Sequence, residues 1–200
     1  MKLLFISGKF GSGKTTLADN LYNCKDLNKY TVMTYNFADF PKEAIADILD
    51  KDYQYFNIDK QEVTEFNDKD GNSLTKRQLM QYLFEDIFCL LNPYIWAHKV
   101  YRRILINKKR YCRNHYNECL HIISDWRKIT EYQYLTEKLK NDIYDVKTIR
   151  LTNSNLDNND SHISETNLDN FNFDSIIEVS NLNPQETLQA ILKEFEKWGW

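Results

Sequence analysis

Short apolar runs alternate with longer stretches of helical periodicity along most of the chain. The apolar runs fit buried strands, and they cover residues 2–6, 31–35, 120–123, 144–151 and 175–179. Apolar residues three or four positions apart predict helices over residues 15–22, 42–49, 76–91, 94–106, 128–140 and from 184 onward. Strands separated by helices usually form a parallel sheet with helices on both faces. The pattern therefore predicts an α/β fold, a three-layer sandwich around a mainly parallel five-stranded sheet.

Two polar stretches interrupt this alternation. Residues 51–74 are polar and rich in tyrosine, and the pair Asp70-Gly71 indicates a turn within them. Residues 152–172 are rich in asparagine, aspartate and serine, a composition that does not pack a core of its own. We interpret the first stretch as a surface insertion, and we expect the second to stay outside the core.

A glycine-rich motif joins the first predicted strand to the first predicted helix. The segment Gly8–Thr15 reads GKFGSGKT and matches the P-loop pattern G-x-x-x-x-G-K-[ST]. Its glycines let successive backbone N–H groups point at phosphate oxygens, and the helix N-terminus adds positive charge. The strand–loop–helix frame disfavours a chance glycine turn. The residues expected to hold the phosphates of ATP are Gly8, Gly11, Ser12, Gly13, Lys14, Thr15 and Thr16.

Two further roles follow from the chemistry of this motif. The Lys14 ammonium is expected to bridge the outer phosphates, and the Thr15 hydroxyl is expected to hold Mg²⁺. Asp125 ends the buried run 120–123, where an acid supports Mg²⁺ or its water shell in P-loop folds. The sequence therefore predicts ATP and Mg²⁺ as cofactors.

Charged residues also follow the predicted strands at their carboxyl ends, where ligands bind in open α/β sheets. They are Asp39, Asp125, Arg127 and Arg150. A P-loop alone does not separate kinases from other nucleotide hydrolases, and a small-molecule kinase needs a second anion site. Arginine suits that site because its planar fork binds phosphate bidentately. Arg77, Arg127 and Arg150 are the candidates, although each alone is more often a surface residue.

Net charge and the length of the apolar runs indicate which kinds of partner the chain binds. The net charge of −3 gives no global sign of nucleic acid or an anionic membrane, so we interpret the basic residues between 99 and 113 as a solvated helix face. No apolar run reaches the length of a membrane span, and no signal peptide precedes Gly8. We expect a cytoplasmic protein that acts on a small molecule. A homodimer is one option for its assembly.

The four cysteines form no CxxC pair, and we expect them to stay thiols in a reducing compartment. The pattern Cys112-x2-His115-x3-Cys119-x-His121 invites a zinc interpretation. Its spacing fits no standard zinc module, so core or surface roles are favoured for these side chains.

Five segments in the same order resemble the deoxynucleoside monophosphate kinases of the bacteriophage type, within the P-loop nucleoside-phosphate kinases. They are FISG through GKTTLAD at 5–19, FADFPK at 37–42, TKRQLMQYL at 75–83 with NPYIW at 92–96, SDWR at 124–127 with Glu131, and DSHISE at 160–165 with Leu168-Asp169 and Phe173-Asp174. The P-loop is generic, whereas the later segments with this spacing are much more specific.

This resemblance implies transfer of the ATP γ-phosphate to a deoxynucleoside monophosphate. It implies substrate-binding roles for Lys9, Asp39, Lys42, Arg77, Gln81, Trp96, Arg127 and Glu131. It places Lys14, Asp125, Arg127 and Arg150 in catalysis, and His162 and Glu165 in a lid over ATP. The expected organisation is a single P-loop kinase domain over 1–200. Its core covers about 1–37, 117–151 and 173–200, with an acceptor-binding helical insertion at about 38–116 and a short lid at about 152–172. If the chain is viral, it acts in host cytoplasm.

The chain also departs from the family pattern. Phe84-Glu85 stand where a Gly-Thr pair is usual, and Cys89 stands where relatives often carry arginine. Arg150 is kept at the start of the lid, but the second arginine and the proline that usually follow are absent. Phe10 occupies the place of a basic residue, which Lys9 is expected to replace. Two alternatives therefore stay open: a P-loop kinase for another small phosphorylated metabolite, and a weakly catalytic nucleotide-binding protein.

Overall fold

The computed structural model describes residues 1–112, 118–143, 145–156 and 167–200. Within these ranges the chain forms two compact units. Unit 1 comprises Met1–Asn36 and Val100–Trp200, and unit 2 comprises Phe37–Lys99. Unit 2 is therefore shorter than the insertion expected at 38–116, because the chain from Val100 onward belongs with the sheet of unit 1.

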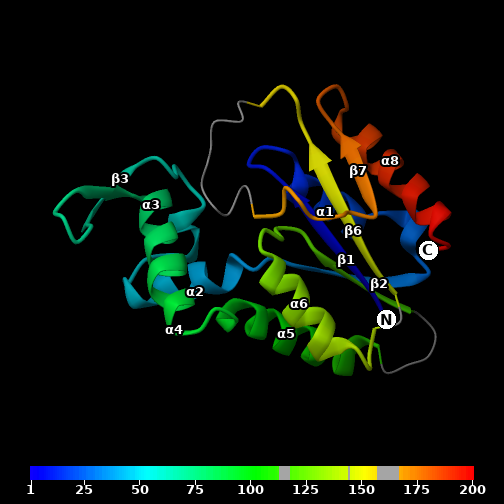
Figure 1. The fold of residues 1–200 in the computed structure, drawn as a ribbon, viewed down its shortest axis with the longest axis horizontal. Coiled ribbons are helices and arrows are strands. Elements are labelled where there is room, and N and C mark those ends of the chain that lie inside the picture. The colour runs from blue at the N-terminus through cyan, green and yellow to red at the C-terminus, as the bar shows by residue number, and fades with distance from the viewer. Residues whose placement is uncertain (113–117, 144, 157–166) are drawn as a thin grey trace. The chain divides into compact units, whose positions relative to one another are not determined.

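The sheet of unit 1 has five strands in the order β2-β5-β1-β6-β7 (Figure 1). The strands are β1 (Lys2–Gly8), β2 (Tyr30–Tyr35), β5 (Glu118–Ile123), β6 (Asp145–Thr152) and β7 (Ser175–Glu178). Every neighbouring pair is parallel. All five strands therefore end at one edge, and the central strand β1 carries the glycine motif there. This confirms the predicted fold class.

Helices cover both faces of this sheet. On one face, α1 (Lys14–Tyr22) and α8 (Pro184–Lys197) pack on Leu4 and Ile6 of β1 through a continuous apolar cluster. The short 3-10 helix Lys25–Leu27 follows α1. On the other face, Phe5 lies 5.1 Å from the ring of Tyr132 in α6 (Ile129–Leu139). Part of α5 (Ile95–Tyr111) lies on this face too, since Asn107 donates to the Tyr35 hydroxyl at 3.0 Å. Because β1 alternates its side chains between two apolar layers, it is buried nearly throughout.

Unit 2 is a small helical unit with one hairpin. Its elements are α2 (Asp39–Ile48), η2 (Tyr53–Phe56), β3 (Val63–Asn67), β4 (Ser73–Thr75), α3 (Lys76–Gln81), η3 (Tyr82–Phe88) and α4 (Cys89–Leu91). Ile45, Phe56, Leu74 and Leu79 form its core. The predicted helix 42–49 in fact begins at Asp39, so Pro41 lies in its first turn.

The insertion 51–74 contains structure that the polar pattern did not reveal. β3 and β4 pair antiparallel around a turn in which Asp68 accepts the backbone N–H groups of Asp70 and Asn72 at 2.9 and 2.8 Å. Gly71 completes the turn at a φ of 86°, which favours glycine. The turn was predicted at the correct place, and the strands were missed because they are short.

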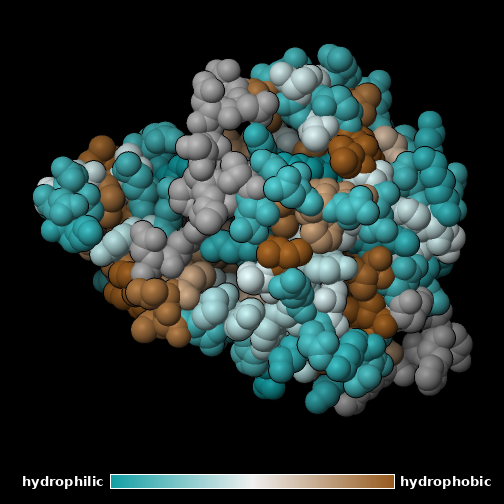
Figure 2. Space-filling view, viewed as in Figure 1, coloured by the Kyte–Doolittle hydropathy of each residue, from teal (hydrophilic) through white to brown (hydrophobic). Residues whose placement is uncertain are grey.

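The helix predicted over residues 76–91 changes its winding. Residues Tyr82–Phe88 form a π-helix between α3 and α4. Phe84 and Phe88 both lie against the indole of Trp96, at ring distances of 5.5 and 5.4 Å. A periodicity of three and four does not distinguish the two windings. Leu90 and Leu91 of α4 are largely exposed. Figure 2 shows a brown, hydrophobic surface in the region where Figure 1 labels α4.

One expectation about the cysteines is wrong. Cys112 and Cys119 form a disulfide, with 6.3 Å between their Cα atoms, whereas Cys24 and Cys89 are not part of a disulfide. The cause is tertiary: α5 ends beside the beginning of β5, which brings the two cysteines within the range that a disulfide spans. In the ranges that the structure describes, no helix combines the length and apolarity needed to cross a membrane.

Candidate functional site

The glycine motif turns sharply between β1 and α1. Gly8, Gly11 and Gly13 have φ angles of 153°, 80° and 83°, values that L side chains rarely adopt. A Cβ atom on Gly8 would lie 2.5 Å from the Ser12 hydroxyl and 2.7 Å from the Leu151 carbonyl oxygen. The close approach of β6 thus requires a glycine at the end of β1. The result is a tight loop that leads into the N-terminus of α1, the arrangement that binds phosphate.

Lys14, the first residue of α1, reaches back across this loop. Its ammonium donates to the carbonyl oxygens of Gly8 and Lys9 at 2.6 and 2.8 Å, and to the Ser12 hydroxyl at 3.4 Å. The side chain is largely buried, so the cation is held at the centre of the loop. A flexible lysine stem can exchange such carbonyl partners for phosphate oxygens. The role of Lys14 in binding the outer phosphates stays a prediction.

Thr15 and Asp125 are the residues expected to hold Mg²⁺. Thr15 is exposed in the first turn of α1, and Asp125 is partly exposed just beyond β5. β5 pairs directly with β1, and Phe5 lies opposite Ile123 in their register. The hydroxyl and the carboxylate therefore follow adjacent strands at one edge of the sheet. Both are oxygen donors, which Mg²⁺ prefers, so the residues fit the ion.

The segment Ser124–Lys128 after β5 is anchored on three sides. Ser124 donates its hydroxyl to the Asn36 side-chain oxygen, which ties the ends of β5 and β2 together. The Trp126 indole is fully buried and donates to the Lys128 carbonyl oxygen at 2.7 Å. Glu131 accepts the N–H groups of Arg127 and Lys128 at 3.2 and 3.0 Å. Arg127 is thereby carried on a rigid turn beside the P-loop strand.

Glu131 is buried beneath this segment. Burial raises the pKa of the Glu131 carboxyl to about 8, and the negative charge of Asp125 acts in the same direction. The two backbone N–H groups and Lys128 lower the pKa, but their effect is smaller. A neutral carboxyl still accepts N–H bonds through its carbonyl oxygen. Glu131 therefore acts as a positioning residue for the Arg127 turn.

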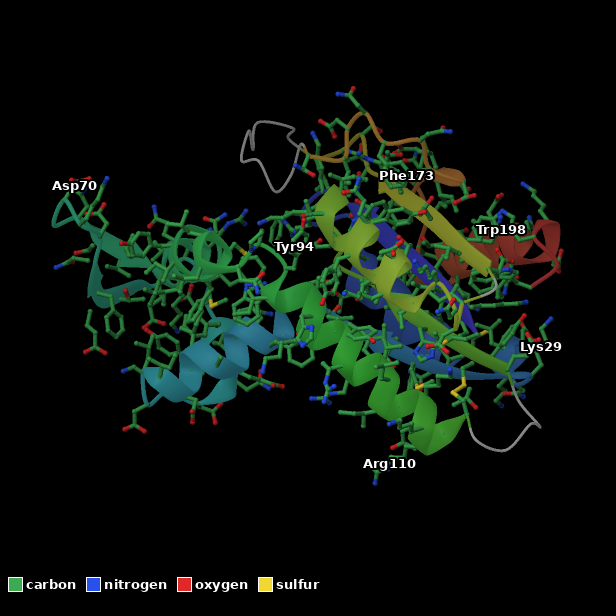
Figure 3. All side chains as sticks on the ribbon, turned by 60° about the horizontal axis from the view of Figure 1, so that its bottom comes forward. Lys29, Asp70, Tyr94, Arg110, Phe173 and Trp198 are labelled. Carbon is green, nitrogen blue, oxygen red and sulfur yellow. A yellow bond between two sulfur atoms is a disulfide. The ribbon has the colours of Figure 1, made fainter. Side chains whose placement is uncertain are left out.

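Arg150 in β6 contacts the end of the segment 152–172, which the sequence predicts as a lid. Its guanidinium donates to the Leu168 carbonyl oxygen at 2.8 Å and forms an ion pair with Asp169. It also lies 5.5 Å from the centre of the Phe173 ring (Figure 3). Phe173 belongs with Phe171, Trp126 and Tyr132 to one aromatic cluster. Arg150 thus fastens the end of the lid segment to the sheet.

The described ends of the lid segment are both attached to unit 1. On one side, Ser154 donates its N–H to Glu178 of β7 at 3.0 Å. Hydrogen bonds from Ser180, Ser154 and Thr152 lower the pKa of Glu178 to about 2. On the other side, Asn167 accepts the N–H of Ile129 at the start of α6, at 3.0 Å. His162 and Glu165 lie outside the described residues.

Five residues expected to bind the acceptor belong to unit 2. Asp39 lies in the first turn of α2, and Lys42 of the same helix donates to the Asn57 side-chain oxygen at 2.9 Å. Arg77 and Gln81 are partly buried on α3. Trp96 is buried against Phe84 and Phe88, and no hydrogen-bond partner for its Nε1 lies in the part of the chain that the structure describes. Of these five residues, the two cations Lys42 and Arg77 thus lie on the neighbouring helices α2 and α3.

Two supports of the site escaped the sequence interpretation. Asn36 and Asn167 hold the ends of β5 and α6 through single hydrogen bonds from Ser124 and Ile129. Asparagine is abundant throughout the chain, so neither residue stood out. The strand order places β2 next to β5, so Asn36 after β2 lies beside Ser124 after β5.

Comparisons with known proteins extend this picture. The profile of a family described as deoxynucleotide monophosphate kinase matches residues 36–190. No curated protein matches the chain. Among solved structures, the tunicamycin resistance protein of Deinococcus radiodurans superposes with a TM-score of 0.50 at 11% identity, over 98% of this chain and 96% of that protein. At this identity, the likeness shows a shared fold.

Two kinases superpose less well. A hexameric APS kinase from Thiobacillus denitrificans has a TM-score of 0.48 at 12% identity, over 99% of this chain and 29% of that chain. A gluconokinase from Sinorhizobium meliloti 1021 has a TM-score of 0.46 at 12% identity, over 98% of this chain and 93% of that chain.

Proposed function

We propose, because this chain belongs to the deoxynucleotide monophosphate kinase family, that it transfers the γ-phosphate of ATP to a deoxynucleoside monophosphate. In this reaction, an oxygen of the acceptor phosphate forms a bond to the γ-phosphorus. The bond from that phosphorus to the β–γ bridging oxygen breaks, and ADP leaves with the electron pair. The observation that carries the proposal is the P-loop with Lys14 at its centre, at the strand edge of a chain whose family is known.

The residues of unit 1 supply the ATP half of this proposal. Backbone N–H groups of the Gly8–Thr16 segment bind the β- and γ-phosphates. The Lys14 ammonium stabilises the negative charge that develops between these phosphates during transfer. When bound by Thr15 and Asp125, Mg²⁺ neutralises phosphate charge. Arg127 contributes a fixed guanidinium for the acceptor or transferred phosphate, held in place through Glu131. Lys9 adds a second cation on the loop.

Five residues of unit 2 are proposed to bind the acceptor. Lys42 and Arg77 are proposed to bind the phosphate of the monophosphate, and Gln81 its base or sugar. Asp39 and Trp96 complete the proposed set. Support comes from their positions in the matched segment 36–190 and from the two cations on neighbouring helices.

The lid is proposed to close over ATP and exclude water, since hydrolysis competes with transfer. The attachment of Arg150 to Leu168 and Asp169 supports a hinge at its base. His162 and Glu165 are proposed as its ligand-facing residues.

A second candidate is a kinase for another small phosphorylated metabolite. The observation that favours it is the π-helix Tyr82–Phe88, which contains Phe84 and Glu85, two of the positions where this chain departs from the family pattern. Extra-wide helical turns occur frequently at functional sites. A changed winding next to Gln81 would alter an acceptor pocket while leaving the P-loop intact.

A coupled ADP-release assay tests the proposal. Full-length protein is mixed with Mg-ATP and a panel of nucleoside monophosphates, deoxynucleoside monophosphates and other small phosphorylated metabolites, and products are identified by mass. We expect ADP release that depends on a deoxynucleoside monophosphate and yields its diphosphate. ADP release that depends only on other phosphorylated metabolites would favour the second candidate. ATP binding without any acceptor-dependent turnover would contradict both and indicate a nucleotide-binding protein.

A further inference from the structure

Three metal-ligating side chains converge on the face of the sheet of unit 1 that carries α5 and α6. Cys112 follows α5, and Cys119 and His121 lie two residues apart on one face of β5. One ligand atom from each residue lies within 4.8 Å of the other two. The cluster lies along the first part of β5, whereas the P-loop lies at the opposite edge, where the strands end. It is therefore a separate feature from the proposed kinase site.

The imidazole of His121 gives an independent indication of a ligand. The side chain is fully buried, and its Nε2 has no hydrogen-bond partner among the described residues. An unpaired buried nitrogen is energetically costly, so its presence calls for an explanation such as a bound ion. Figure 3 shows the neighbouring sulfur atoms beside the end of α5 that carries Arg110.

The surroundings of His121 fix the orientation of its ring. Nδ1 lies 2.9 Å from the Tyr35 hydroxyl, and that hydroxyl also accepts from Asn107 at 3.0 Å and donates to the Met33 sulfur at 3.6 Å. With its proton directed to Met33, the Tyr35 oxygen accepts from Nδ1–H. Nε2 then carries a lone pair. A histidine held through its other nitrogen in this way is the usual form of a metal ligand.

We propose that Cys112, Cys119 and the Nε2 of His121 bind a soft divalent cation of the zinc class when the two cysteines are reduced. Two thiolates and one imidazole are donors that zinc prefers, and water would complete a tetrahedral shell. The two thiolates balance the charge of the ion. The disulfide and the metal complex are alternative states of the same pair of cysteines.

The chemistry of the exchange balances with a dithiol as reductant. The dithiol gives two electrons and two protons to the disulfide, becomes a disulfide itself, and leaves Cys112 and Cys119 as thiols. The cation then displaces two thiol protons. With zinc–sulfur bonds of about 2.3 Å, the two sulfurs lie roughly 3.8 Å apart in a tetrahedral shell. Cys112 is partly exposed after the end of α5, so rotation of its side chain supplies this separation.

The spacing of these residues along the sequence disfavours a zinc site, whereas their proximity in the fold favours one. Standard modules draw their ligands from tight local loops. Here the ligands come from the end of a helix and from alternate positions of a strand, and tertiary packing brings them together. In either state, the link joins the end of α5 to β5.

Cobalt binding tests the proposal, because tetrahedral Co²⁺ with thiolate ligands absorbs in the visible and near ultraviolet. The full chain is reduced with a phosphine, freed of metal and titrated with Co²⁺ alone. We expect about one equivalent to bind with thiolate-to-cobalt bands, and Zn²⁺ to displace it. The oxidised protein should show no bands. Absence of bands in the reduced protein would overturn the proposal.

Variants identify the ligands. Cys112→Ser, Cys119→Ser and His121→Asn should each weaken Co²⁺ binding at least about tenfold, and Cys24→Ser is the matched control that should leave it unchanged. Unchanged binding in the His121→Asn protein, or loss of binding in the Cys24→Ser protein, would overturn the assignment.

A measurement on the unaltered chain avoids the risk that a buried variant fails to fold. The reduced protein is treated with iodoacetamide with and without Zn²⁺, and each cysteine peptide is measured by mass. We expect Zn²⁺ to slow alkylation of Cys112 and Cys119 but not of Cys24 or Cys89. Equal protection of all four cysteines, or of none, would contradict the site.

Discussion

Two loops at the strand edge of unit 1 are held by side chains of opposite charge. The P-loop follows β1, and the cation of Lys14 donates to its carbonyl oxygens. The Ser124–Lys128 turn follows the adjacent strand β5, and the carboxyl of Glu131 accepts its N–H groups. Both side chains belong to the first turn of the helix that follows their loop. The two loops therefore use the same architecture with the donors and acceptors reversed.

The difference between them separates a ligand-facing role from a supporting one. The Lys14 ammonium is bound by neutral backbone carbonyl oxygens, and phosphate oxygens can replace these weak partners. Glu131 is about as buried as Lys14, but it accepts the N–H groups of its own turn, so it supports the loop from beneath. We therefore expect changes at Lys14 to act on the reaction, and changes at Glu131 to act on stability and on the placement of Arg127.

Lys14→Ala should have the largest effect on the reaction. Removing a fixed cation from developing phosphate charge is expected to lower kcat by about 10³-fold or more. The thermal unfolding of the variant should stay near that of the original chain, because only long-stemmed contacts to carbonyls are lost. Initial rates of ADP release and a melting curve measure the two quantities. Lys29→Ala, an exposed lysine before β2, is the matched control, and full activity in Lys14→Ala would refute the P-loop assignment.

Arg127→Ala should have the next largest effect. Loss of one guanidinium from a phosphate site costs about 10- to 100-fold in kcat/KM for the acceptor, with a much smaller change in ATP binding. Acceptor kinetics at saturating ATP and direct measurement of ATP affinity separate the two. An effect confined to ATP binding would move Arg127 out of the acceptor site.

Glu131→Gln should change the dependence of stability on pH. The pKa of Glu131 is raised to about 8 in the folded protein, above its ordinary value of 4.5. The folded state therefore retains a proton that the unfolded state loses, and the stabilisation from this proton falls as the pH rises from 4.5 to about 8. The loss approaches about 1.4 kcal/mol per pH unit. Glutamine keeps an acceptor oxygen but does not titrate.

Denaturant unfolding of both proteins at several pH values measures this difference. The stability of the original chain relative to Glu131→Gln should decline over that window. Glu131→Ala serves as the comparison that leaves the Arg127 and Lys128 N–H groups unpaired, at a cost of about 1–3 kcal/mol. Parallel pH profiles for the original chain and Glu131→Gln would show that Glu131 does not carry the proton.

How far the sequence predicts this molecule depends on the range of the contacts involved. The P-loop and the parallel sheet were predictable because glycine turns and apolar runs are local signals, and both agree with the structure. Arg127 was a candidate from its position after a predicted strand, whereas Glu131 came only with the family resemblance, since a buried carboxylate has no local signature. The Asn36–Ser124 link was missed because it joins distant segments. The disulfide of Cys112 with Cys119 and the π-helix after Gln81 were missed because neither residue spacing nor apolar periodicity signals them.

Ser12→Ala should have the smallest effect and thereby test how Lys14 is held. The Ser12 hydroxyl accepts from the Lys14 ammonium at 3.4 Å, the longest of its three contacts, whereas the two carbonyl contacts belong to the backbone. Backbone partners survive any substitution, so the cation should keep its position. We expect a change in kcat below about threefold and in stability below about 0.5 kcal/mol. A loss of kcat comparable with that of Lys14→Ala would show that Ser12 contacts phosphate directly. Ser12 would then share with Lys14 the ligand-facing role that separates the P-loop from the Ser124–Lys128 turn.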